Sequence, residues 1–126
     1  MASLKDKAIS LLGTFTGSIA TGANPTLFTT VAGKVTRITS IVFRDPSGSA
    51  AAATNLSCTG FPGSISLANL VTANTGYVVA GAAAAAGSPQ TPTQGTEIAA
   101  STAVVLTTTT GAAVTVTVDV YGYTST

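Results

Sequence analysis

The C-terminal part of the chain carries the clearest alternation of apolar and polar residues. From residue 114 to residue 120 every second residue is a valine. Successive side chains of a β-strand point to opposite faces, so the pattern predicts a strand whose valines face a core. Its other residues would face outward: Thr115, Thr117, Asp119 and Tyr121. A slip of one residue would exchange the two faces, so the register is strongly specified.

Seven further segments combine Val, Ile, Thr, Phe and Tyr between Gly, Pro, Asn and Ser residues, which is typical of strands bounded by turns. About eight strands at this spacing indicate an all-β domain, either a sandwich, a barrel or a jelly roll. The seven segments are residues 14–19, 27–31, 35–43, 54–59, 64–70, 77–80 and 97–108.

The segments 27–31 and 35–43 are expected to form a hairpin. Gly33 lies between them and can adopt the positive φ that a tight reversal needs. The second segment does not alternate cleanly, because Val35 and Ile38 fall on opposite faces. This irregularity predicts a bulge, or burial of both faces toward the end of the strand. The sequence from Arg44 to Gly48 then signals a turn.

Residues 3–12 carry the only helix signal, with Ser3 as the N-cap and Gly13 as the stop. On such a helix the apolar side chains would share one face, among them Leu4, Leu11 and Leu12. A helix this short does not persist alone in water, so we expect it to fray or to dock on its own domain or a partner. The predicted organisation is an N-terminal arm or short helix over 1–13 and one β domain over 14–126. The alanine-rich segment 81–96 is expected to be a long loop with a functional role or high mobility.

Charge is scarce in this chain. Of its 126 residues, five are basic and four acidic, and none of the residues between Asp45 and Glu97 is charged. An ordinary domain has about one quarter of its residues charged. With 45% hydrophobic residues the chain is expected to fold. An uncharged exterior lowers the desolvation cost of covering a face with a neighbour, so the composition predicts a protein made for assembly.

Composition also argues against several partners and reactions. With a net charge of +1, the composition predicts neither nucleic acid nor an anionic membrane as a partner. No apolar run is long enough to span a bilayer. Without histidine, hydrolytic triads and histidine metal sites are impossible, and a single cysteine, Cys58, makes no thiolate cluster. Cys58 is expected to be a small buried residue. We expect no cofactor and no metal.

An enzyme would have to work with four carboxylates. Glycoside hydrolysis needs two, and Glu97 with Asp119 could be neighbours across strands. We expect instead that each carboxylate occupies a solvated end or an outward strand position, and that the protein is not an enzyme. The glycine-rich stretch Gly13-Thr14-Phe15-Thr16-Gly17 lacks the lysine of a phosphate-binding loop.

The candidate interface residues are basic or aromatic, together with the N-terminal leucines. Basic side chains could meet phosphate or acidic residues of another subunit, or could guard a solvated strand edge. Tyrosines could anchor a protein interface or stack on a sugar. The candidates are Leu4, Leu11, Leu12, Lys34, Arg37, Arg44, Tyr77, Tyr121 and Tyr123.

Three segments, residues 27–45, 69–77 and 114–123, resemble the small jelly-roll auxiliary proteins that decorate the capsids of tailed bacteriophages. The resemblance implies a jelly-roll β-sandwich on the exterior of the virion, often a homotrimer, assembled in the host cytoplasm. Such a subunit cements neighbouring copies of the major capsid protein. Two alternatives stay open: a head- or tail-fibre module that binds a glycan through Tyr77 or the loop 81–96, and a pilus or surface-layer subunit.

Overall fold

The computed structural model describes residues 9–48, 55–66, 78–80, 96–110 and 114–126. These residues form strands and connections and contain no helix, which confirms the all-β prediction. The strands are β1 (Ser10–Ser18), β2 (Thr26–Thr29), β3 (Val35–Arg44), β4 (Asn55–Cys58), β5 (Phe61–Ser66), β6 (Val78–Ala80), β7 (Ala103–Thr110) and β8 (Thr115–Ser125).

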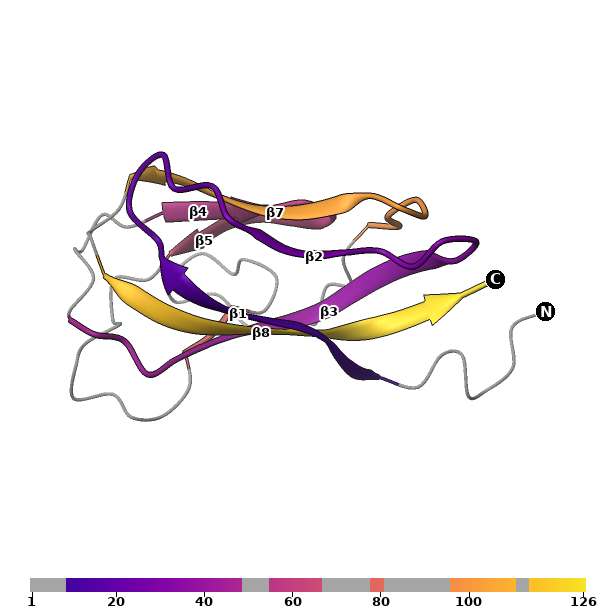
Figure 1. The fold of residues 1–126 in the computed structure, drawn as a ribbon, viewed down its shortest axis with the longest axis horizontal. Helices are drawn as coiled ribbons and strands as arrows, with labels where there is room; N and C mark the ends of the chain where they lie inside the picture. Colours follow the sequence, from indigo (N-terminus) through magenta and orange to yellow (C-terminus); the bar gives the residue numbers. More distant parts are fainter. Residues whose placement is uncertain (1–8, 49–54, 67–77, 81–95, 111–113) are drawn as a thin grey trace.

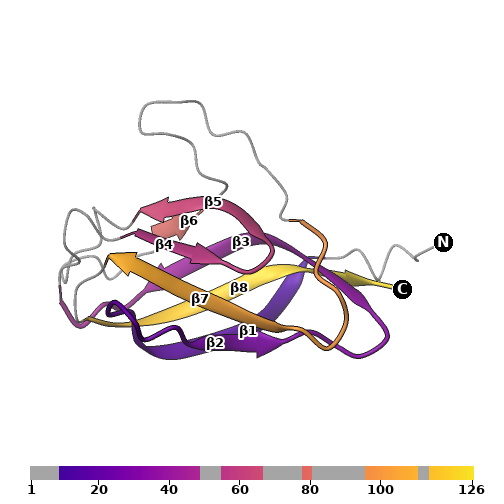
Figure 2. The same ribbon diagram turned by 90° about the horizontal axis from the view of Figure 1, so that it is seen from above.

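The strands form two antiparallel sheets, one with the order β1-β8-β3-β6 and the other with the order β2-β7-β4-β5. Figure 1 shows the two sheets as separate layers, and in Figure 2 the strands of one layer lie over those of the other. The first strand pairs with the last, β2 with β7, β3 with β6, and β4 with β5. Two further pairings, β3 with β8 and β4 with β7, join these pairs into the sheets.

The core lies between the two sheets and draws on both. In the first sheet, Val116, Val118 and Val120 of β8 are completely buried, as the alternation predicts. Val104 and Leu106 of β7 supply matching fully buried side chains from the second sheet. In both layers the apolar side chains at alternate positions face the other sheet, which is the arrangement by which two amphipathic sheets remove their apolar faces from water.

The N-terminal helix prediction is wrong where the structure describes it. Leu11 and Leu12 belong to β1, which begins at Ser10 and pairs with β8 as far as Ser18. A short helix gains few hydrogen bonds of its own, whereas pairing with β8 supplies partners along most of the strand. The expected boundary at residues 13 and 14 therefore falls inside β1. Residues 1–8, with Leu4, lie outside the described residues.

The predicted hairpin is also wrong, although its turn is present. Gly33 has φ of 77°, and the backbone N–H of Lys34 donates to the carbonyl of Val31 at 3.3 Å. The flanking strands β2 and β3 lie in different sheets, so the turn carries the chain from one layer to the other. Local sequence specifies the reversal, while the partners of each strand come from distant segments.

The bulge in β3 and the start of β7 can also be compared with the sequence predictions. The irregular alternation of β3 reflects a register shift between Ile38 and Ser40, which confirms the predicted bulge. The expected strand 97–108 is regular only from Ala103. Ahead of it the chain turns at Ser101, which has φ of 55°, and Ile98 makes an isolated bridge with Thr36.

Two buried threonines differ in how their hydroxyls are satisfied. Thr36 is 1% exposed and its Oγ1 has no hydrogen-bond partner. Thr30 is 4% exposed, and its Oγ1 donates to the carbonyl of Ala99 at 2.7 Å and accepts from the N–H of Thr102 at 2.8 Å. A buried hydroxyl without a partner destabilises the folded state, whereas a fully bonded one contributes to it.

We predict that Thr36→Val raises the free energy of unfolding by about 1 kcal/mol, because the methyl group fills the same space without an unpaired hydroxyl. Thr30→Val is the matched control and should lower the free energy of unfolding by about 1 to 2 kcal/mol, because it leaves a carbonyl and an N–H without their partner. Urea unfolding of the three proteins measures both changes. Destabilisation by both variants would contradict the assignment of Thr36.

Candidate functional site

Polar side chains converge on the side of β1, β8 and β3 that faces away from the core, called the outer face below. Antiparallel register places Thr14 of β1 opposite Asp119 of β8, and Thr16 opposite Thr117. Arg44, at the end of β3, lies opposite Thr117 on the other side of β8. Residues opposite each other in adjacent strands point to the same face, so these five side chains form one cluster.

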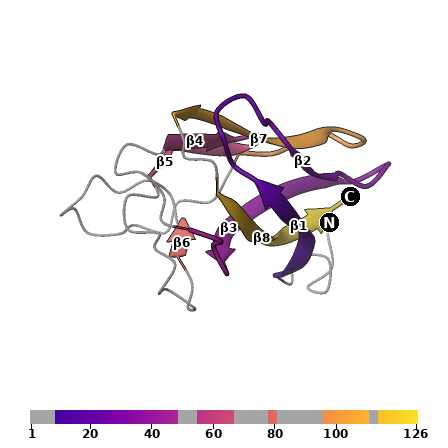
Figure 3. The same cartoon turned by 60° about the vertical axis from the view of Figure 1, so that its left-hand side comes forward.

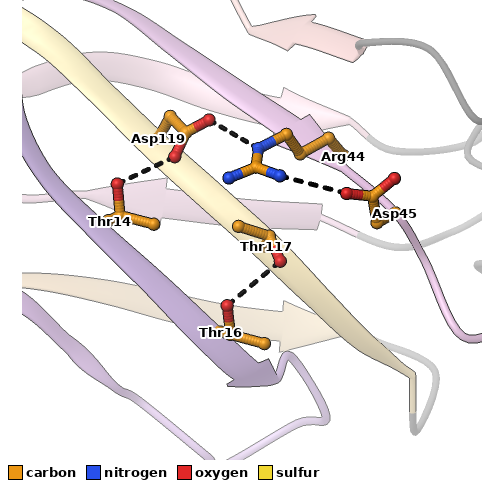
Figure 4. Close-up of polar contacts among 6 residues, drawn as sticks. All are labelled: Thr14, Thr16, Arg44, Asp45, Thr117 and Asp119. Carbon is orange, nitrogen blue, oxygen red and sulfur yellow. Dashed lines mark hydrogen bonds and ion pairs between the residues drawn. The ribbon is translucent and has the colours of Figure 1, made fainter.

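Asp119 is the centre of this cluster (Figure 4). Arg44 Nε donates to Asp119 Oδ2 at 2.7 Å, and Thr14 Oγ1 donates to Asp119 Oδ1 at 2.9 Å. Each carboxylate oxygen thus accepts a hydrogen bond from a different neighbouring strand. Beside this group, the hydroxyls of Thr16 and Thr117 lie 3.0 Å apart and share a hydrogen bond. The cluster ties β1, β8 and β3 together through side chains as well as backbone.

The neighbours of Asp119 also determine its ionisation. Although it points away from the core, Asp119 is only 6% exposed. The hydrogen bond from Arg44 is the main cause that lowers the pKa of Asp119, helped by the bond from Thr14, while partial burial acts in the opposite direction. The same hydrogen bond raises the pKa of Arg44. Asp119 therefore occupies the outward strand position that the alternation predicts, but there it is an ionised and nearly covered carboxylate.

The turn after β3 adds a second acidic partner. Arg44 Nη1 lies 3.1 Å from Asp45 Oδ2, and the Asp45 side chain is 59% exposed. Asp45 has φ of 51°, a left-handed conformation that aspartate tolerates better than most residues. The guanidinium of Arg44 is thus held between two carboxylates, one covered and one in solvent.

The structure does not gather the three basic candidates into one patch. Lys34 precedes β3, Arg37 is near its start and Arg44 is its last residue, so the two arginines are separated by roughly 20 Å of extended strand. Arg37 Nη2 lies 3.8 Å from Glu97 Oε2, and both side chains are more than one third exposed. Glu97 and Asp119, considered together above as a catalytic pair, are each paired with an arginine of their own.

Apolar and aromatic candidates occupy the end of the outer face near the start of β3. Leu11 is 52% exposed and lies opposite Tyr121 in the register of β1 and β8. Tyr123 lies opposite Arg37. Leu12 instead packs against the core. Tyr77 and residues 81–95 of the predicted loop 81–96, on which the glycan-binding alternative rests, lie outside the described residues.

The remaining chemical groups can be located as well. Cys58 is buried, as predicted, and burial raises the pKa of its thiol to about 12. Within the described ranges, no three His, Cys, Asp or Glu residues are grouped so that they could hold a metal ion. A search of the same residues for a helix of sufficient length and hydrophobicity to cross a bilayer finds none.

The sequence alone does not predict the pairing of Asp119 with Arg44 and Thr14. The alternation of β8 indicates that Asp119 is a charged residue on the outward side of the strand. Its partners come from strands 75 and 105 residues away in the chain, and only the register brings them together. Comparisons with protein families, with curated proteins and with solved structures find no match to this chain.

We predict that Asp119→Asn lowers the free energy of unfolding at pH 7 by about 1 to 2 kcal/mol. Hydrogen bonds to charged groups contribute about 1.5 to 3 kcal/mol to stability. The Arg44 side chain is 35% exposed, so solvent screens its interaction with Asp119 and reduces this contribution. Glu97→Gln makes the same change from carboxylate to amide in an exposed pair. It should change stability by no more than about 0.5 kcal/mol.

The difference between the native protein and Asp119→Asn should depend on pH. A carboxylate whose pKa is lowered on folding stabilises the native state fully above its unfolded pKa of about 3.9, and that contribution is lost as the pH falls below it. Chemical unfolding from pH 3 to pH 7 tests this dependence. A constant difference across the range would show that Asp119 does not act through its charge.

Proposed function

We propose that the chain is a non-enzymatic structural subunit of a virus particle, a jelly-roll decoration or cement protein that binds the shell of the major capsid protein and stabilises it. The observation that carries the proposal is the pairing of the strands. A jelly roll is a long antiparallel ribbon, in which first strand pairs with last, wound into two sheets. The pairs β1–β8, β2–β7, β3–β6 and β4–β5 fit that ribbon.

A second line of support is that the charged side chains of the outer face are already paired within the chain. Asp119 has its hydrogen-bond donors within the chain, and Arg44 and Arg37 each lie beside a carboxylate. Covering an ion pair that is already formed requires no new charged partner from the other subunit. The threonine hydroxyls beside it can exchange water for protein partners at small cost.

In this proposal the outer face lies on the shell and its apolar end supplies the anchors. Tyr121, Tyr123 and Leu11 offer apolar surface, and tyrosine adds a hydroxyl that tolerates a partly wet interface. A subunit that binds the assembled shell, and not its separated components, raises the stability of the shell by mass action. The position on the virion exterior and the trimeric state are expectations that come with the resemblance.

The proposal predicts that the purified protein binds expanded shells made of the major capsid protein of the same virus and raises their melting temperature. Co-sedimentation and calorimetry measure the two effects. Shells that neither bind the protein nor gain stability would contradict the proposal. Saturable binding to a glycan array in place of shell binding would favour the receptor-binding alternative.

A matched pair of variants tests whether the outer face is the contact. Leu11 and Val31 are aliphatic and similarly exposed, at 52% and 55%, but Val31 precedes the turn between β2 and β3. We predict that Leu11→Ser weakens shell binding about tenfold, the usual loss for a moderately important interface side chain. Val31→Ser should leave binding unchanged. Equal effects of the two variants would exclude the outer face as the contact.

A further inference from the structure

β1 differs from the other strands that lie at the edges of the two sheets. The edges are β1 and β6 in one sheet and β2 and β5 in the other. β6 has three residues, β2 has four and follows Pro25, and β5 contains Pro62. Short length and proline are common ways to keep a free edge from pairing with another chain. β1 has nine residues, no proline and no charge.

The position of β1 leaves one of its sides without a strand partner among the described residues. Figure 3 shows β6, β3, β8 and β1 in sequence across the sheet, with β1 last. A register shift between Leu11 and Gly13 makes the N-terminal end of the strand irregular. From Gly13 to Ser18 the pairing with β8 is regular, so this stretch can accept another strand on its free side.

Within this regular stretch, residues 13–17 read the same in both directions: Gly13-Thr14-Phe15-Thr16-Gly17. In an antiparallel pair of two such strands, centred on Phe15, Thr14 of each copy lies opposite Thr16 of the other. Direct threonine pairs across strands are favourable because their hydroxyls hydrogen-bond. The same kind of pair already exists on the other side of β1, between Thr16 and Thr117 at 3.0 Å.

The glycines of this stretch have a role within the chain. A Cβ at position 17 would lie 2.5 Å from the ring of Phe15, and one at position 13 would lie 2.9 Å from Phe28. Internal packing thus accounts for Gly13 and Gly17. Thr14 and Thr16, which lie between these glycines, also bond toward β8 through Asp119 and Thr117. Both threonines nevertheless remain exposed and uncharged, and they are the residues that a paired strand would contact.

Charge also favours a second copy over another partner. A two-fold axis places two identical strand edges against each other, so an edge with charges of one sign would repel its copy. The sequence has no charged residue between Lys7 and Lys34. An edge suited to a charged partner strand would instead carry the complementary charge.

We infer that two copies of this chain pair through β1, antiparallel and centred on Phe15, to make one continuous sheet across a two-fold axis. Each chain has a single β1, so the pairing closes at a dimer and does not propagate into a fibre. The inference is independent of the proposed function, since it concerns the isolated protein and requires no shell. It favours a two-fold contact where the resemblance suggests a trimer.

The register can be tested by exchanging charges. Thr16→Glu places two like charges near the two-fold axis, and we expect it to raise the dimer dissociation constant about tenfold, because the symmetry applies each change twice. The double variant Thr14→Lys/Thr16→Glu places each lysine opposite the glutamate of the other copy. It should restore the dissociation constant to within about threefold of the native value.

Thr26→Glu is the matched control, because it makes the same substitution at an exposed position of the edge strand β2. It should leave the dimer unchanged. Sedimentation velocity over a concentration series measures the dissociation constants, and thermal melting confirms that each variant is folded. A native protein that stays monomeric, a trimer unaffected by Thr16→Glu, or a double variant no tighter than Thr16→Glu alone would each overturn the inference. Loss of shell binding with an intact dimer would count only against the proposed function.

Discussion

β8 runs through the middle of its sheet with β1 paired along one side and β3 along the other, so its register determines the position of both neighbours. The alternation of valine with polar residues permits only one assignment of the two faces. Displacement by one residue would bury Thr117 and Asp119 in the core and expose three fully buried valines. Hydrophobic burial therefore specifies the register, and the register specifies which side chains meet on the outer face.

The Asp119 cluster is a consequence of that register and contributes to it in turn. Because Arg44 and Thr14 reach Asp119 from opposite sides of β8, any slip of either neighbour would separate an ionised carboxylate from a donor. Leaving a covered charge without its partner is far more costly than the pair itself is stabilising. The cluster thus destabilises wrong registers through contacts on the outer face, whereas the core destabilises them through contacts on the opposite face. The same arrangement gives the outer face charges that are already paired, which suits the assembly role proposed for it.

The order and approximate positions of the strands could be predicted from the sequence because they depend on local signals. Those signals predict the bounds less accurately, since β1 begins at Ser10 and not at residue 14, and β5 at Phe61 and not at residue 64. Alternation identified β8, turn residues separated the other strands, and the mixed parity of Val35 and Ile38 indicated the bulge in β3. Partners could not be predicted, because pairing depends on residues far apart in the chain. The turn at Gly33 predicts a hairpin, whereas β2 and β3 lie in different sheets and pair with distant strands.

The candidate site could be predicted only in part for the same reason, because its contacts depend on pairing between distant strands. Residue type alone indicates several interface candidates, and strand register brings five of them to the side of the sheet that faces away from the core: Leu11, Arg37, Arg44, Tyr121 and Tyr123. Residue type does not reveal that Asp119 is covered or that it is bonded to Arg44 and Thr14, because those partners come from distant strands. Leu11 and Leu12 fit the apolar face of a helix as well as they fit a strand, and pairing with β8 decided between the two.

Hydrogen exchange at single-residue resolution tests the central role of β8 most directly. If β8 organises the fold, the amides from Val116 to Val120 exchange slowest of all and at rates that follow global unfolding, as expected for a strand paired on both sides. The exposed carboxylate of Glu97 provides a contrast, because Glu97→Gln should leave those rates unchanged while Asp119→Asn accelerates them. Fast exchange along β8, or protection greatest in strands of the other sheet and insensitive to Asp119→Asn, would contradict the account.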